Sequence, residues 1–268
     1  VDISCIEFNQ FSTIIKKFDL YSGLPNPYKI IWTSTQRRFF MENFFGWKDE
    51  FFSLTQIVPS LKEQFTENPQ NAWLTVATII GCIALLIVLI KAKKIEFTSQ
   101  LITRIGIALA LATILKLLRL YHFPQGGSIT LGSMVPILLI AFMYGPQVGC
   151  LTGFLYGVIT FIMDPYILHP VQVLFDYPLP FTALGLAGFF KDKRLLGVGI
   201  SVFIRFLCHF ISGVAFFGMY APEGMSSWIY SLSVNGPMIG IEGIICLVIV
   251  SVLPVNRIIN ATSKFGTV

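Results

Sequence analysis

Charged residues are scarce in this sequence. Only 12% of its 268 residues are Asp, Glu, Lys or Arg, whereas 54% are hydrophobic. An ordinary soluble domain is about 25% charged. This composition therefore excludes the common soluble classes and predicts a protein embedded in a lipid bilayer, with no nucleic acid as a partner.

The usual motifs of metal and nucleotide chemistry are also missing. The chain has no CxxC, no HExxH, no Walker-type glycine loop and no Asp-rich diphosphate motif. Four of its five cysteines fall inside hydrophobic runs and leave Cys5 alone, so no disulfide framework is expected. We therefore expect no metal, no cofactor and no ATPase activity in this chain, and the energy for any transport must come from elsewhere.

Long hydrophobic runs take the place of these motifs. A hydrocarbon core about 30 Å thick is crossed by about 20 mostly apolar residues in a helix. Seven runs qualify as spans of an all-α membrane protein, and the later ones are interrupted by Gly or Pro. They cover residues 73–90, 101–118, 129–145, 147–163, 171–190, 195–219 and 228–253.

Basic residues predict the orientation of these spans. The clusters KAKK (91–94) and KDKR (191–194) and the tail 256–268 all fall on one side, which the positive-inside rule makes cytoplasmic. The N-terminal segment and the loops 121–127, 164–170 and 220–228 are then outside. Arg104 and Lys116, near the ends of the second run, are expected to extend toward the lipid headgroups.

Residues 1–70 differ in composition from the rest of the chain, with seven Lys or Arg, eight Asp or Glu and many aromatic residues. We interpret them as an extracellular, partly helical appendage whose amphipathic helices lie against the bilayer or the bundle. The chain begins at Val1 rather than Met, which leaves open an upstream signal or anchor.

Several polar side chains lie within or near the last five spans, where ionisable groups are costly and by default indicate function. Asp176 lies in HPVQVLFDYPLPF (169–181), His209 follows Arg205 by one helical turn, and Asn235 lies in YSLSVNGPMIG. With the neighbouring tyrosines they predict a pocket for a flat, cationic or amine-bearing ligand. Plainer roles are an interior histidine for His209, a helix cap for Asn235 and helix packing for Glu242.

Three segments together resemble a known family. They are ITLGSMVPILLIAFMYGPQVGCLTGFLYGVI, PYILHPVQVLFDYPLPFTALGLAGFF, and HFISGVAFF followed by YSLSVNG. In order and spacing they are similar to the thiamine-specific S components, the substrate-binding membrane subunits of energy-coupling factor (ECF) vitamin transporters. The resemblance covers roughly residues 100–255 and implies a six-helix bundle. The run at 73–90 is then an additional transmembrane helix.

The resemblance implies that the chain captures thiamine, or a close relative, with high affinity at the cell membrane. Uptake would be powered by a separate ECF module, consisting of a transmembrane coupling subunit and two ATPases, and the resemblance implies that the chain itself is not an enzyme. The implied substrate-binding residues are Asp176, Tyr177, His209, Asn235, Tyr230, Tyr166, Tyr156 and Phe217.

This chain departs from the family at four of its ligand positions. Tyr156 and Phe217 stand where the family has tryptophan, a third tryptophan position falls near Gly127, and Asp176 replaces a glutamate. These changes leave three outcomes open. They are weaker thiamine binding, a compensating side chain from residues 1–70, or a related ligand such as a phosphorylated thiamine or its pyrimidine precursor.

The family docks on its coupling subunit through a stripe of small residues on the first helix of the bundle, which lets a partner helix approach closely. Gly106 and Ala110 match this stripe. Ala108 and Ala112 form a second small pair on the adjacent face, so the sequence alone leaves the docking face open between the two pairs.

Three other functions compete with this reading. A proton-coupled secondary transporter of a small cationic or heteroaromatic solute would titrate Asp176 or Glu242, but the sequence shows no inverted repeat. A serine hydrolase would combine Ser226 or Ser227 with His209, although both serines lie in a predicted loop. The third is a sensor that binds its ligand without transporting it.

Overall fold

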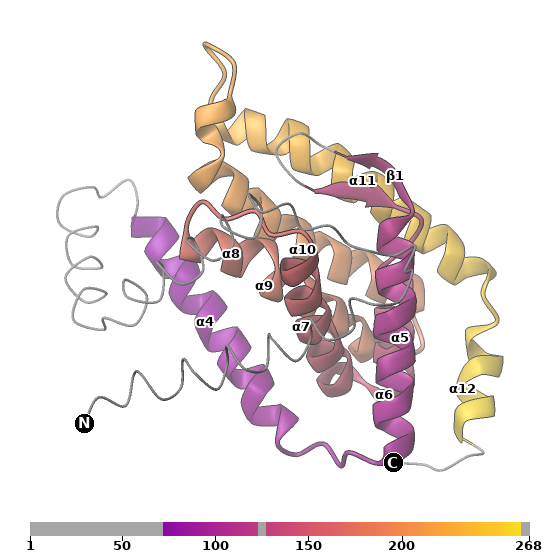
Figure 1. Cartoon of the computed structure of the whole chain (residues 1–268). Coiled ribbons are helices and arrows are strands. Elements are labelled where there is room, and N and C mark those ends of the chain that lie inside the picture. Colours follow the sequence, from indigo (N-terminus) through magenta and orange to yellow (C-terminus); the bar gives the residue numbers. More distant parts are fainter. Residues whose placement is uncertain (1–71, 123–126, 264–268) are drawn as a thin grey trace, which may run out of the picture. The chain divides into compact units, whose positions relative to one another are not determined.

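The structure is a computed structural model that describes residues 72–122 and 127–263. The predicted appendage at 1–70, Cys5 and the last residues of the predicted tail lie outside this part of the chain. The elements, shown in Figure 1, are α4 (Ala72–Ala92), α5 (Ser99–Leu117), β1 (Arg119–His122), β2 (Ser128–Thr130), α6 (Val135–Tyr144), α7 (Pro146–Met163), α8 (Pro170–Asp176), α9 (Pro178–Ala183), η3 (Leu184–Phe190), α10 (Arg194–Phe216), η4 (Gly218–Tyr220), α11 (Ser227–Val252) and α12 (Val255–Ser263).

Six helical segments are long and apolar enough to cross a membrane: α4, α5, α7, the stretch Pro170–Phe190, α10 and α11. The predicted run at 129–145 is shorter than expected, because its first residues belong to β2 and α6 has only 10 residues. Together α5, α6, α7, Pro170–Phe190, α10 and α11 give the expected six-helix bundle, and α4 is the expected additional helix.

The fifth predicted span is not one continuous helix. It consists of α8, α9 and the 3₁₀ segment η3, and the backbone breaks at Tyr177, where φ is −120° and ψ is −78°. Pro178 and Pro180 follow the break, and proline lacks the N–H that a continuing helix would require. Asp176 is consequently the last residue of α8, and Tyr177 is the joint between two helices.

A glycine face on α7 receives this broken segment. Gly149, Gly153 and Gly157 recur every four residues and so lie on one side of the helix. A Cβ atom on Gly153 would lie 2.0 Å from the carbonyl oxygen of Phe181, and one on Gly157 would lie 2.6 Å from that of Tyr177. Only glycine allows this approach, so the backbone of α9 rests directly on α7.

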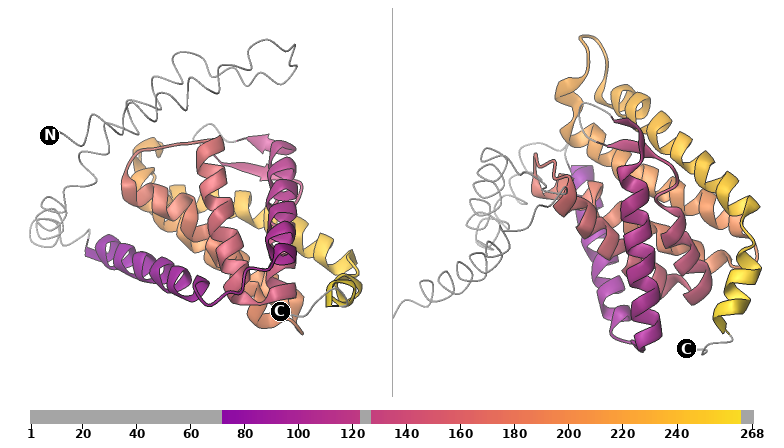
Figure 2. Two further views of the ribbon diagram at one scale, coloured as in Figure 1. Left: turned by 60° about the horizontal axis from the view of Figure 1, so that its bottom comes forward. Right: turned by 45° about the vertical axis from the view of Figure 1, so that its right-hand side comes forward.

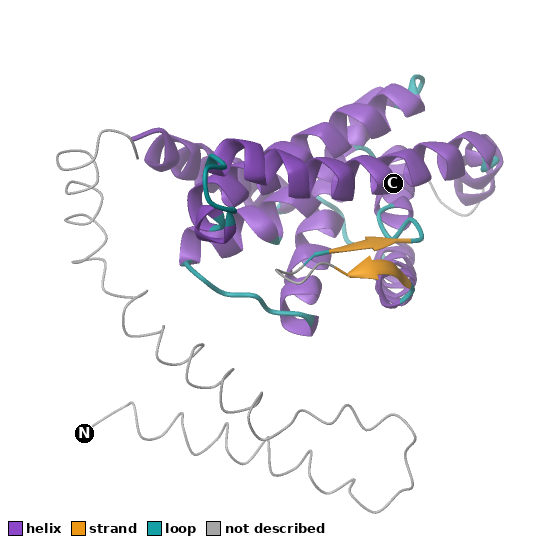
Figure 3. Cartoon of the chain, turned by 90° about the horizontal axis from the view of Figure 1, so that it is seen from above, coloured by secondary structure: helices purple, strands orange, loops and turns teal. Residues whose placement is uncertain are grey.

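A two-stranded antiparallel hairpin follows α5, in a region that the sequence analysis treated as a plain loop. Its strands β1 and β2 pair Tyr121 with Ile129 and His122 with Ser128 (Figure 3). Strand β2 contacts both α5 and α11. The hairpin therefore connects the end of the first bundle helix to the last one.

The core of the bundle lies between α6, α7, η3, α10 and α11. Helices α10 and α11 pack along each other, as the two views of Figure 2 show. The additional helix α4 packs against α7, α8 and α9 and exposes a row of large aliphatic side chains, as expected of a surface that faces lipid. Helix α12 begins at the buried Val255 and continues into the predicted tail. The largest fully buried apolar side chains include Tyr156, Phe142, Met134, Ile137, Leu138, Leu184 and Ile239.

Candidate ligand-binding pocket

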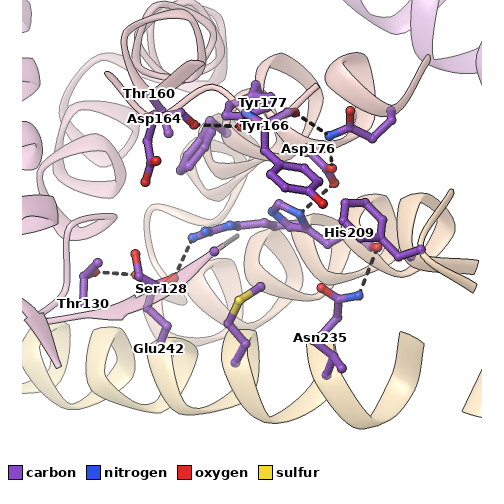
Figure 4. Close-up of a pocket in the computed structure, with 18 of the residues that line it drawn as sticks. Ser128, Thr130, Thr160, Asp164, Tyr166, Asp176, Tyr177, His209, Asn235 and Glu242 are labelled. Carbon is purple, nitrogen blue, oxygen red and sulfur yellow. Dashed lines mark hydrogen bonds and ion pairs between the residues drawn. The ribbon is translucent and has the colours of Figure 1, made fainter. Parts of the chain in front are cut away.

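A cavity of about 220 Å³ lies among α5, the hairpin, α7, α8, α10 and α11 (Figure 4). The fold brings together side chains from positions 116 to 242 of the chain around this one space. Every substrate-binding residue expected from the sequence borders it: Asp176, Tyr177, His209, Asn235, Tyr230, Tyr166, Tyr156 and Phe217.

The carboxylate of Asp176 is held from two sides. Its Oδ1 atom lies 3.3 Å from Nδ1 of His209, and its Oδ2 atom accepts a hydrogen bond of 2.6 Å from Nε2 of Gln172. Gln172 also donates to the carbonyl of Tyr166 and accepts from the backbone N–H of Leu168. The sequence analysis missed Gln172, although its place one helical turn before Asp176 was a usable signal.

His209 and Asn235 connect α10 to α11. The Nδ2 atom of Asn235 donates to the His209 carbonyl and to the Ser231 hydroxyl, each at 3.2 Å. No described residue bonds the Asn235 side-chain oxygen, which leaves that atom to meet a ligand. Helix α11 continues through Pro237, so Asn235 does not cap a broken helix. The Nε2 atom of His209 is buried and makes no hydrogen bond within the described residues.

Aromatic rings form the wall near the loop 164–169. Tyr166 stacks on Phe217 with ring centroids 5.7 Å apart and an interplanar angle of 22°, and its hydroxyl bonds that of Tyr220. Burial, followed by this hydrogen bond, raises the pKa of Tyr166 to about 12, so the phenol is neutral. The Tyr177 hydroxyl accepts from the Tyr166 N–H and donates to the Asp164 carbonyl, which fixes the loop to the joint.

Tyr156 has a structural role in addition to its position at the cavity. The side chain is fully buried, and its hydroxyl donates to the Ala112 carbonyl at 3.1 Å. Its ring also meets Phe181 edge-on at 4.9 Å. Tyr156 therefore ties α7 to α5.

A buried ion pair lies on the hairpin side of the cavity. Arg205 and Glu242 are 3.0 Å apart, with side-chain exposures of only 8% and 2%. Thr130 of the hairpin donates to Glu242, and the Arg205 guanidinium lies over the Phe181 ring. Glu242 thus joins α11 to α10 and to the hairpin through specific polar contacts, which makes the plainer role of helix packing more definite. A pair of opposite charges inside two predicted spans was the signal that the sequence offered.

Lys116 and Gly127 also border the cavity. The expectation that Lys116 extends toward the headgroups was wrong, because its side chain is turned inward and buried. Gly127 has a φ of +83°, and a Cβ atom there would lie 2.7 Å from the sulfur of Met238. Methionine thus occupies the space beside the position where the resemblance places a lost tryptophan.

Three polar residues lie away from the pocket lining: His169 and the two serines named in the sequence analysis. His169 stacks on Phe216 and caps α8, with its Nδ1 atom accepting the N–H of Val171. Ser226 caps α11, and neither Ser226 nor Ser227 borders the cavity with His209. The serine hydrolase hypothesis therefore has no geometric support.

The two pairs of small residues on α5 have different surroundings. Ala108 and Ala112 are buried in the bundle. Gly106 and Ala110 are exposed, and a Cβ atom on Gly106 would meet nothing within 4 Å. The pair Gly106 and Ala110 is therefore the one available to another helix.

Comparison with known proteins places most of the chain in one group. The family model described as "Thiamine transporter protein (Thia_YuaJ)" matches residues 102–261. The thiamine transporter ThiT of Bacillus subtilis is 37% identical over 177 residues, covering 58% of this chain and 92% of that protein. ThiT of Lacticaseibacillus paracasei is 31% identical over 175 residues, covering 58% and 87%.

A solved structure gives the same fold. The structure of ThiT from Listeria monocytogenes matches with a TM-score of 0.53 and 24% identity, and it covers 61% of this chain and 95% of that one. The family match begins within α5, so α4 and everything before it lie outside the matched region.

Proposed function

Since this chain belongs to the thiamine transporter protein family, we propose that it captures thiamine in the pocket around Asp176 for uptake into the cell. The protein is a multi-pass membrane protein with the helical fold of an S component. The observation that carries the proposal is the meeting, at one cavity, of the largely buried Asp176 carboxylate with several aromatic rings.

The pocket suits the chemistry of thiamine. Thiamine combines a permanently cationic thiazolium ring with an aminopyrimidine ring. The Asp176 carboxylate supplies the opposite charge, and because it is largely buried, its attraction for the cation is little screened by water. Rings of Tyr166, Phe217 and His209 offer faces for stacking, and the free oxygen of Asn235 accepts a hydrogen bond from the exocyclic amine.

Transport requires energy from a second protein in this proposal. The partner is an ECF transmembrane coupling subunit with two ATPases, and the outward-facing pair Gly106 and Ala110 is the docking stripe. In the orientation that the basic clusters favour, the segment before α4 is outside and the C-terminus is cytoplasmic. The pocket then opens to the outside, where the vitamin is captured.

The alternative of a proton-coupled carrier is weakened by the surroundings of its candidate groups. Glu242 contacts Arg205 and accepts a hydrogen bond from Thr130, so both of its carboxylate oxygens already have partners inside the protein. A carrier that used Glu242 would have to break this buried ion pair in each transport cycle.

Equilibrium binding tests the proposed function. Calorimetry on the detergent-purified protein should show submicromolar binding of thiamine, with free hydroxymethylpyrimidine as a weaker competitor. No detectable binding of thiamine would overturn the assignment. The protein alone in liposomes should not accumulate thiamine, and accumulation driven by a proton gradient would favour the carrier.

A further inference from the structure

A positive charge without a direct ion pair among the described residues lies at the cavity. Lys116 is in the last turn of α5, its residue is only 9% exposed, and it lines the cavity. Among the described residues, no hydrogen bond or ion pair is formed by its ammonium group. An unpaired charge at such a depth is costly, which by default indicates that a ligand supplies its partner.

Two ties between neighbouring elements define where Lys116 lies. The Tyr156 hydroxyl of α7 donates a hydrogen bond to the Ala112 carbonyl of α5. About two helical turns further along the chain from each of these residues, Arg119 pairs with Asp164 at 2.9 Å. Lys116 follows Ala112 by one helical turn, so it lies between the two ties.

Thr160 occupies the equivalent place on α7. It follows Tyr156 by one helical turn and also lines the cavity. Its hydroxyl is buried and forms no hydrogen bond within the described part of the chain, and the neighbouring Tyr156 hydroxyl on the same helix is already engaged with Ala112. The ammonium of Lys116 and an unsatisfied hydroxyl are thus brought to the same end of the cavity.

The remaining charges at this end are already matched. Asp164 is held by Arg119, and Glu242 is held by Arg205. Lys116 is therefore the cation at this end that has no direct ion pair among the described residues, although Asp164 and Glu242 are near enough to attract it. Figure 4 shows Thr160 and Asp164 on one side of the pocket and Asp176 with His209 on the other. The cavity thus has a cation without a direct ion pair on one side and a carboxylate on the other.

We propose that Lys116 and Thr160 form a subsite for a phosphoryl group, and that the ligand best matched to the cavity is thiamine monophosphate. This inference rests on the proposed function. In thiamine monophosphate the thiazolium ring is cationic, and an anionic phosphoryl group replaces the hydrogen of the terminal hydroxyl. The ester therefore carries both the positive and the negative charge that the pocket matches. A lysine ammonium binds phosphate as a point charge, and a threonine hydroxyl adds a directed hydrogen bond.

Calorimetry with thiamine and thiamine monophosphate on the full chain tests the proposal. Wild type should bind the monophosphate at least as tightly as thiamine. Lys116→Gln should weaken monophosphate binding about 10- to 100-fold, the effect of a lost charge-assisted hydrogen bond. The same variant should change thiamine binding by no more than about twofold, because the lost contact involves only the phosphate.

Three further measurements separate this role from a purely structural one. Lys116→Arg should retain most of the monophosphate affinity, and Lys93→Gln, at an exposed lysine, should change neither ligand. Thr160→Val should weaken the monophosphate alone and serves as a second variant if Lys116→Gln does not fold. Inorganic phosphate should bind far more weakly than the ester, since it cannot reach Asp176.

Two results would contradict the proposed phosphoryl subsite. Equal losses for both ligands in Lys116→Gln would make Lys116 a structural residue at the α5 C-terminus, where a positive charge is favourable. Inorganic phosphate binding as tightly as the ester would overturn the ester assignment. In either case thiamine binding by wild type would leave the proposed function intact, whereas its absence would mark the failure of that function.

Discussion

The Asp176 carboxylate touches the His209 imidazole, with 3.3 Å between Oδ1 and Nδ1, while Gln172 holds the other oxygen. The carboxylate comes from the end of α8 and the imidazole from the middle of α10. A cation that binds here must share the carboxylate with His209. The charge of Asp176 is thus positioned in advance, and a ligand gains from it without first ordering the side chain.

Asp176→Asn should weaken thiamine binding by about 1.5 to 3 kcal/mol, because the amide keeps the shape but loses the charge-assisted interaction. Calorimetric titration measures the change. Asp192→Asn, at an exposed aspartate in the loop before α10, is the matched control and should bind as wild type does. An unchanged affinity in Asp176→Asn would remove Asp176 as the counter-charge.

Gly106→Trp should leave ligand binding unchanged and abolish uptake in cells that contain the coupling module. The added ring meets nothing within this chain, so its cost arises only when a partner helix approaches. Gly240 of α11 is likewise exposed with open space around its Cα, and Gly240→Trp should transport normally. Uptake at the wild-type rate in Gly106→Trp would place the docking surface elsewhere.

Glu242→Leu should destabilise the folded protein by about 3 to 5 kcal/mol, because Arg205 would remain buried without a partner. The double variant Arg205→Met with Glu242→Leu should recover most of this loss, since an apolar pair of similar volume avoids the desolvation cost. Thermal unfolding in detergent compares the two. A double variant no more stable than the single one would show that the pair contributes more than its desolvation penalty.

The free energy of unfolding should decrease as the pH is lowered, because of His169. Partial desolvation lowers the pKa of His169 below its ordinary value of 6.5, although the residue stays exposed enough for water to reduce the effect, and its neutral Nδ1 accepts the Val171 N–H at the start of α8. The unfolded chain therefore binds the proton more readily, and this contribution is present above about pH 6.5 and lost below it. Melting curves at pH 5 to 8 should show a decline in wild type.

His169→Asn provides the control for this pH effect. Asparagine also caps helices well but does not titrate, so the variant should lose part of the decline at low pH. Any decline that remains belongs to other groups. Identical pH profiles for the two proteins would exclude His169 as its source.

The spans were predictable from the sequence because a membrane requires long apolar runs, and composition alone reveals these. The residues around the cavity were identified through the family resemblance, and their role in binding stays a prediction. The inward direction of Lys116 was not predictable, because a lysine near a helix end can turn either to the headgroups or to the interior. That choice depends on the hairpin and on α7, which no local pattern near Lys116 indicates.

The break at Tyr177 had a visible cause that hydropathy does not register. Pro178 and Pro180 leave the apolar run long enough to cross the membrane, yet they interrupt its helix. The Arg205–Glu242 pair was missed for a different reason. The two residues are 37 positions apart, and only the packing of α10 against α11 makes them neighbours.

The glycine face of α7 has a consequence for how this transporter tolerates sequence change. Gly153 and Gly157 hold the backbone that carries Tyr177 and Phe181, and neither glycine lines the cavity. A single added methyl group at Gly157 would push the joint away from α7 and move Asp176 with it. Vitamin specificity could then be altered, or lost, by substitutions at positions that never touch the vitamin.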